Sequence, residues 1–164
     1  MKKVLSLTVA LLCVLTCLVA CQKEKAPEKQ DYSFAVGSVK VTTDDAAKPL
    51  LEALGTPIER TVRPSCLFGN ANDVLYVYQG LEIETYTKDG VEYLYNIELV
   101  DDSVDRKTPE GIGVGDSRQA VIKAYGEPDS TSPAGAAIYN GKNMTLNFFY
   151  SGDTVSRIAY RKNV

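Results

Sequence analysis

Four glutamates on two neighbouring predicted strands are the residues in this sequence best suited to carry chemistry. Two carboxylates at a suitable separation can act as acid and base in glycoside hydrolysis. Each glutamate also alternates with apolar or aromatic residues, as solvent-facing positions of a strand do, and that pattern requires no catalysis. We favour a solvated strand face over a carboxylate-dependent hydrolase. The residues concerned are Glu82, Glu84, Glu92 and Glu98.

Other forms of catalysis have less support. The chain contains no histidine, which excludes Ser-His-Asp and Cys-His catalysis and imidazole-ligated zinc. Cys66 has Arg60 and Arg63 nearby in the sequence, and positive charge lowers the pKa of a thiol. It lacks a positioned base, however, and cysteine is among the most buried residue types, so we interpret Cys66 as a structural thiol. We predict that the protein is not an enzyme.

We also predict no cofactor and no metal. The acidic run with Asp101, Ser103 and Asp105 imitates the opening of a calcium-binding loop. Arg106 stands where that loop requires glycine, and Ile112 stands where it requires a bidentate glutamate. The run is therefore interpreted as a solvated linker.

The first twenty residues have the organisation of a lipoprotein signal peptide. Lys2 and Lys3 precede an apolar run over residues 4–19, which is too short for a confident membrane span. The tetrapeptide LVAC at residues 18–21 resembles a bacterial lipobox, which implies cleavage before Cys21 and lipid on its thiol. We predict a protein anchored by that lipid to the extracytoplasmic face of the cell membrane, with residues 21–31 as a charged, flexible tether.

The remaining 32–164 segment is predicted to be the folded part. Removal of Lys2 and Lys3 leaves 16 basic against 21 acidic residues, a net charge of −5 from counts of 18 and 21 in the whole chain. This charge argues against nucleic acid as a partner. Cys66 is the one cysteine after Cys21, so no disulfide framework is expected.

A short helical unit occurs twice in this segment. In IGVGDSRQAVIKAYGEP (112–128), Asp116 is the predicted N-cap, Gly126 the left-handed stop and Pro128 the break that follows. The segment VTTDDAAKPLLEALGTP (41–57) has the same plan 71 positions earlier, the difference between 126 and 55. Pro49 is unfavourable in the middle of a helix and predicts that the first copy is short or kinked.

Period-two alternation follows each helical unit. Strands are predicted at 74–78, 81–87 and 91–100, and again at 136–139, 144–150 and 155–162, with turns at Gly80, Gly90 and Asn140-Gly141. Residues 58–72 are interpreted as irregular. The predicted fold is α+β, with two tandem modules, 32–105 and 106–164, each a short helix plus a three-stranded antiparallel meander.

The motif V-G-D-S before the second helix, the G-x-P after both helices and the aromatic-rich last strands resemble one known superfamily. It contains β-lactamase-inhibitor-protein-like and BamE (SmpA/OmlA)-like modules. The segment SCLFG (65–69) and the segment EGIGVGDS (110–117) are similar to lipoproteins of Gram-positive anaerobes. The resemblance implies a non-catalytic, binding role.

A candidate partner surface follows from the alternation. If Val91, Tyr93 and Ile97 face the core, the opposite side of the sheet carries acidic and apolar residues from the first half of the chain and basic and aromatic ones from the second. Aromatic and arginine side chains are common interface anchors. Cover by the other module is the alternative explanation for the apolar members. The candidate set is Glu82, Glu84, Tyr86, Leu94, Phe149, Arg157 and Arg161.

Two functional hypotheses result. The first is a surface lipoprotein that binds an envelope protein as an adaptor or inhibitor. The alternative is a module for a small ligand or cell-wall glycan, with tyrosines such as Tyr86 as stacking platforms.

Overall fold

A computed structural model describes residues 29–65 and 72–163. Cys21 and Cys66 lie outside these ranges, so the predictions made for them lie outside the described residues. The two helices of the described part are α2 (Lys48–Leu54) and α3 (Arg118–Tyr125). The strands are β1 (Phe34–Val36), β2 (Val39–Val41), β3 (Glu59–Pro64), β4 (Asn72–Tyr78), β5 (Leu81–Lys88), β6 (Val91–Leu99), β7 (Ser130–Thr131), β8 (Ala137–Asn140), β9 (Met144–Ser151) and β10 (Thr154–Lys162).

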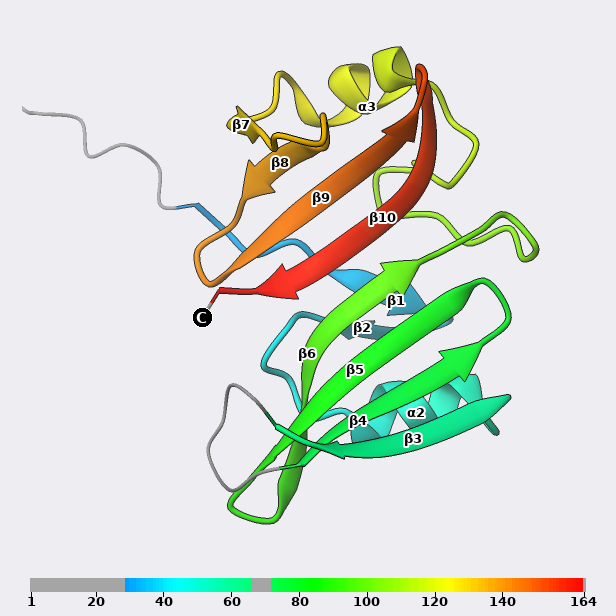
Figure 1. Cartoon of the computed structure of the whole chain (residues 1–164), viewed down its shortest axis with the longest axis vertical. Helices are drawn as coiled ribbons and strands as arrows, with labels where there is room; N and C mark the ends of the chain where they lie inside the picture. Colours follow the sequence, from blue (N-terminus) through cyan, green and yellow to red (C-terminus); the bar gives the residue numbers. More distant parts are fainter. Residues whose placement is uncertain (1–28, 66–71, 164) are drawn as a thin grey trace, which may run out of the picture.

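Eight strands form one antiparallel sheet in the order β3-β4-β5-β6-β10-β9-β8-β7, and β1 and β2 form a separate hairpin (Figure 1). The middle of the large sheet is the pairing of β6 with β10. This pairing, called the seam below, runs from Leu99↔Ile158 to Asn96↔Arg161. It joins two sets of strands that follow α2 and α3, respectively, in the sequence.

The predicted α+β fold of two three-stranded modules is wrong. The molecule is mostly β, and its strands belong to a single eight-stranded sheet rather than to two meanders. The prediction missed β3, which lies in a segment interpreted as irregular, because this edge strand is exposed along its whole length and has no buried alternate positions. It also missed the union of β6 with β10, which pairs two edges that would otherwise be open.

The helices begin and end close to the predicted positions. Pro49 lies in the first turn of α2, where its missing N–H costs nothing, so the helix is short rather than kinked. The N-cap of α3 is Ser117, whose hydroxyl accepts from the Ala120 amide, and not Asp116. Gly55 and Gly126 end the two helices with positive φ, as the sequence predicted.

One face of the large sheet is covered. In Figure 1, α2 and the β1–β2 hairpin lie behind the sheet. Their buried side chains, such as Phe34 and Leu50, join Ile83, Ile97 and Phe148 in one hydrophobic core. No helix of the described part is long and apolar enough to cross a membrane.

The C-terminal ends of α2 and α3 are each hydrogen-bonded to a strand of the large sheet by a tyrosine. The Tyr78 hydroxyl on β4 donates to the carbonyl of Gly55 at 3.4 Å, and the Tyr139 hydroxyl on β8 donates to the carbonyl of Gly126 at 2.8 Å. Each buried tyrosine thus ties the end of a helix to a strand. The arrangement satisfies a carbonyl that the end of the helix would leave unpaired.

A β-bulge divides β6. Glu84 pairs with Asn96 but the next residue, Thr85, pairs with Leu94, so Tyr95 is the extra residue. Because one inserted residue reverses the alternation, Leu94 points to the core beyond the bulge, in line with its full burial. The prediction that Tyr93 and Val91 face the core and that Leu94 lies on the opposite side is therefore wrong: Tyr93 pairs with Tyr86 on the other side of the sheet, and Val91 is 43% exposed.

Candidate binding face of the sheet

Within residues 29–65 and 72–163, no helix or strand lies over the face of the sheet that is turned toward the viewer in Figure 1. We call it the open face. Paired residues of adjacent strands share a face, so the register places Glu84 beside Asn96, Glu82 beside Glu98, and Asn96 beside Arg161 on this side. Residues that the sequence separates by more than sixty positions therefore meet at the seam.

Glu98 is the centre of this arrangement. Its side chain is only 8% exposed and lies between Arg161, at 2.7 Å, and Arg157, at 3.3 Å. Asn96 donates a further hydrogen bond to it at 2.9 Å. Burial by itself raises the pKa of Glu98, but the hydrogen bonds from Arg161 and Asn96 and the charge of Arg157 outweigh it, and the pKa lies below its usual value. Glu98 is held as a carboxylate.

Phe149 packs against the same two arginines. The guanidinium carbon of Arg157 lies 4.0 Å from the ring centroid, and that of Arg161 lies at 5.6 Å. The contacts are of the cation–π type, which is strongest where water is partly excluded. We call Glu98, Arg157, Arg161 and Phe149 the seam cluster.

Next to the seam cluster is a polar hollow of ≈ 380 Å³. Glu84 in its wall is bonded to Arg63 of β3 and accepts from Asn96 at 3.3 Å. Glu82 lies directly opposite Glu98, which is also an acid. Glu82 has no ion pair with the residues that the structure describes. The hollow is lined by Glu82, Glu84, Tyr95, Asn96, Glu98 and Arg161.

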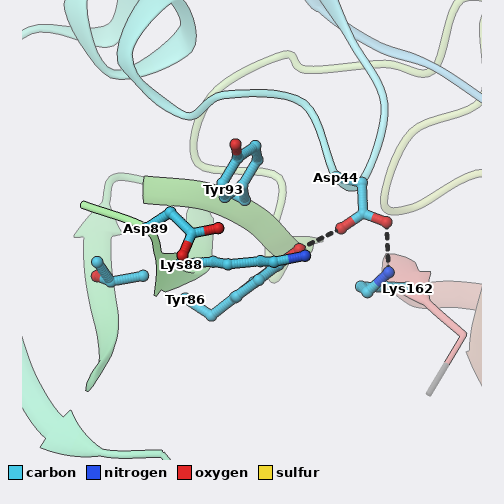
Figure 2. Close-up of a pocket in the computed structure, with 7 residues that line it drawn as sticks. Asp44, Tyr86, Lys88, Asp89, Tyr93 and Lys162 are labelled. Carbon is cyan, nitrogen blue, oxygen red and sulfur yellow. Dashed lines mark hydrogen bonds and ion pairs between the residues drawn. The ribbon is translucent and has the colours of Figure 1, made fainter. Parts of the chain in front are cut away.

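A larger hollow of ≈ 680 Å³ lies near the β5–β6 turn (Figure 2). Asp44, which precedes α2, reaches into it. The Asp44 carboxylate accepts a hydrogen bond from the Tyr86 hydroxyl at 2.5 Å and forms an ion pair with Lys162. Tyr86 stacks with Tyr93 at 5.6 Å between centroids. We call this space the Tyr93 hollow. Its lining is Asp44, Tyr86, Thr87, Lys88, Asp89, Tyr93 and Lys162.

Position in the backbone explains how Asp44 comes to this site. Its amide donates to the Leu94 carbonyl, and the Leu94 amide donates to the Asp45 carbonyl, so the segment before α2 continues the sheet along the part of β6 that β10 leaves free. Asp44 has φ 74°, a left-handed conformation that aspartate tolerates better than most residues. Burial raises the pKa of Asp44, but the hydrogen bonds from Lys162 and Tyr86 lower it by a larger amount. The pKa of Asp44 therefore lies below its usual value.

The structure brings most of the predicted surface together. Phe149, Arg157 and Arg161 meet in the seam cluster, Glu82 and Glu84 line the polar hollow, and Tyr86 lines the Tyr93 hollow. Tyr86 is itself buried, so it supports the neighbouring side chains of the site and offers little surface to a partner.

Leu94 is in the core and is not part of this surface. Glu92 lies on the covered side as well, where it accepts from Thr85 at 2.5 Å and Tyr76 at 2.9 Å. The four glutamates considered for hydrolysis are therefore divided between two faces of the sheet. The opposite-sign halves inferred from sequence also meet at the seam, where Arg157 and Arg161 neutralise Glu98.

Several residues of the Tyr93 hollow had no signal in the sequence. Asp44 and Lys162 are 118 positions apart, and Tyr93 was assigned to the core. A bulge can be suspected where alternation gives two consecutive polar or aromatic positions, as Tyr95 and Asn96 do, but the sequence offers several such places.

Comparison with known proteins finds a distant structural likeness. No protein-family model matches the chain, and no curated protein matches it. Among solved structures, the chain is similar to a DUF4309 family protein (YjgB) from Bacillus subtilis, with 15% sequence identity and a TM-score of 0.44. The match covers 75% of this chain and 82% of that protein.

Proposed function

We propose that the chain is a non-catalytic binding module that docks a protein partner through the open face of its sheet. The observation that supports this proposal is the seam cluster. An aromatic ring and two arginines stand side by side on a face that no helix or strand of the described chain covers.

The composition of the seam cluster suits a protein interface. Arginine and aromatic residues carry a large share of binding energy in protein complexes. The Arg157 and Arg161 side chains are 39% and 46% exposed, so a partner can reach them. Glu98 already fixes both guanidinium groups, and a partner would therefore lose less side-chain freedom on binding than with mobile arginines.

The same contacts weigh against catalysis at this place. A general acid needs a raised pKa, whereas the pKa of Glu98 is lowered by Arg161, Asn96 and Arg157. Glu92 is turned to the other side of the sheet. These features support the proposal that the site binds rather than reacts.

The location of the protein in the cell envelope is part of the same proposal. The lipobox at residues 18–21 and the charged segment 21–31 support a lipid anchor on Cys21 at the extracytoplasmic face of the membrane, with an envelope protein as the partner. The relationship to BamE-like and β-lactamase-inhibitor-protein-like lipoproteins remains a hypothesis that rests on the short motifs.

The test compares retention of envelope proteins by the full-length chain and by Phe149→Ala. This change removes the ring and leaves the ion pairs of Glu98 in place. We expect a specific protein to be retained by the wild type and its affinity, measured with the purified partner, to fall about tenfold or more in the variant. Lys123→Glu on the exposed side of α3 is the control and should retain the partner fully.

Equal retention by wild type and Phe149→Ala would contradict docking at the seam cluster. Substituting Arg157 and Arg161 with glutamate is less informative, because it would surround the buried Glu98 with like charge and test folding as much as binding.

A further inference from the structure

The Tyr93 hollow is separate from the seam cluster and has a different chemistry. Its charged side chains are two acids and two bases: Asp44 and Asp89, and Lys88 and Lys162. The lining therefore has no net charge. A strongly anionic or cationic ligand would meet repulsion as well as attraction, so the balance favours a neutral ligand.

The ion pair in the hollow is fixed and still has hydrogen-bonding capacity. A carboxylate can accept about four hydrogen bonds and an ammonium group can donate three. Asp44 accepts from Tyr86 at one oxygen and from Lys162 at the other. Figure 2 shows both interactions meeting at Asp44, with the Lys88 side chain extended toward the same place.

Such a pair suits hydroxyl groups. A hydroxyl can accept from an ammonium group and donate to a carboxylate at the same time, which a purely anionic or cationic group cannot do. Because the ion pair is already formed, its position does not have to be ordered when a ligand binds.

An aromatic wall completes the hollow. Tyr86 is stacked against Tyr93 with an interplanar angle of 27°, so Tyr86 occupies one face of the Tyr93 ring and holds it in place. Tyr93 is half-buried and lines the hollow. A ligand would pack against the ring surface that Tyr86 leaves uncovered. An apolar ring wall beside fixed donors and acceptors is suited to a molecule with an apolar face and a polar edge.

We infer that the Tyr93 hollow binds a neutral saccharide, with a sugar ring packed on Tyr93 and its hydroxyls bonded to the Asp44–Lys162 pair and to Lys88. The hollow of ≈ 680 Å³ is large enough for more than one sugar unit. This inference does not depend on a protein partner at the seam cluster.

The test is calorimetric titration of the full-length chain, in detergent, with cellotetraose and with tetra-N-acetylchitotetraose as neutral probes. We expect at least one probe to bind, and Tyr93→Ala to weaken its binding about tenfold or more. Tyr93→Phe keeps the ring and should stay within about threefold of wild type. Lys88→Ala, whose side chain is exposed and whose loss should not disturb the fold, should weaken binding several-fold.

Two variants serve as controls. Lys123→Ala on α3 and Phe149→Ala in the seam cluster should bind the saccharide as the wild type does, and Phe149→Ala also separates this site from the proposed protein-docking site. Binding with a millimolar Kd is already weak for a small ligand, so the absence of binding by either probe at about 10 mM would overturn the inference. So would binding that is unchanged in both Tyr93→Ala and Lys88→Ala.

An acidic saccharide tests the argument from charge. Tetragalacturonate should bind no more tightly than the neutral probes. If it binds more than about tenfold tighter and Lys88→Ala abolishes that preference, the hollow is an anion site and the inference of a neutral ligand is wrong.

Discussion

Replacing Glu98 with glutamine is the sharpest test of the energetics assigned to the seam. The change keeps the size of the side chain and removes its charge. In the wild type the carboxylate is 8% exposed and makes ion pairs with Arg161 at 2.7 Å and Arg157 at 3.3 Å. The variant therefore leaves two cations without their buried partner.

The expected loss follows from the exposure of the three side chains. Removing one partner of a fully buried ion pair costs about 3–5 kcal/mol. Arg157 and Arg161 are 39% and 46% exposed, so both guanidinium groups regain water when the carboxylate is lost. We therefore expect Glu98→Gln to lower the free energy of unfolding by about 1–2 kcal/mol at pH 7, and the melting temperature by roughly 3–10 °C.

The dependence on pH identifies the charge as the cause. The pKa of Glu98 in the folded protein is below its ordinary value, so its contribution to stability is present above the unfolded-state pKa near 4.5 and is lost as the pH falls through the folded-state pKa. Urea unfolding at pH 7 and at about pH 3 should show this. The difference in unfolding free energy between wild type and Glu98→Gln should shrink at the lower pH, which lies below the unfolded-state pKa, because Glu98 takes up a proton on unfolding there.

Glu52→Gln is the control. Glu52 is 68% exposed and its nearest cation, Lys48, is 3.7 Å away on the same helix, so the change should cost no more than about 0.5 kcal/mol. Our reasoning would be refuted by a Glu98→Gln variant as stable as wild type at pH 7. It would also be refuted by a loss that stays the same down to pH 3, since that result would assign the effect to packing.

Two further predictions concern the covered side of the sheet. Leu94→Ala should lower the free energy of unfolding by about 2–5 kcal/mol in urea titrations, because Leu94 is fully buried; a loss below about 1 kcal/mol would argue against the bulge that turns it inward. Tyr139→Phe removes the 2.8 Å hydrogen bond to Gly126 and should cost about 1 kcal/mol, whereas Tyr78→Phe, with its 3.4 Å contact, should cost less. The same unfolding experiment compares the two, and an equal or reversed order would contradict the hydrogen bonds described.

Local sequence signals predicted the central strands well. β5, β6, β9 and β10 show alternation between turn residues, and each lies within about two residues of its predicted bounds, as is usual for strong local patterns. Gly55 and Gly126 were predicted as helix ends from their conformational freedom and the prolines that follow. These features depend on neighbours in the sequence.

Features that depend on distant neighbours were missed. β3 becomes a strand because β4 offers it a partner, and its own exposed residues carry no buried pattern. The pairing of β6 with β10 depends on two edges from different halves of the chain. No local pattern encodes which edge meets which.

The site was predicted in part for the same reason. Phe149, Arg157 and Arg161 lie on adjacent strands β9 and β10, and alternation alone put them on one face. The bulge at Tyr95 reversed the alternation on β6, which removed Leu94 from the site and added Tyr93. Asp44 joins because its segment pairs with β6, a contact between residues some fifty positions apart.

The shortness of the seam has a consequence for how the chain folds. Its ladder contains four residue pairs, from Leu99↔Ile158 to Asn96↔Arg161, and connects residues about sixty positions apart. The hairpins on either side close over much shorter loops, and long loops close more slowly, so joining the two half-sheets should be a late step in folding. Before that step β6 and β10 are open edges, and the same four pairs can form between two copies of the chain. Refolding at high concentration should therefore yield dimers with exchanged halves, a product that slow refolding of dilute chains avoids.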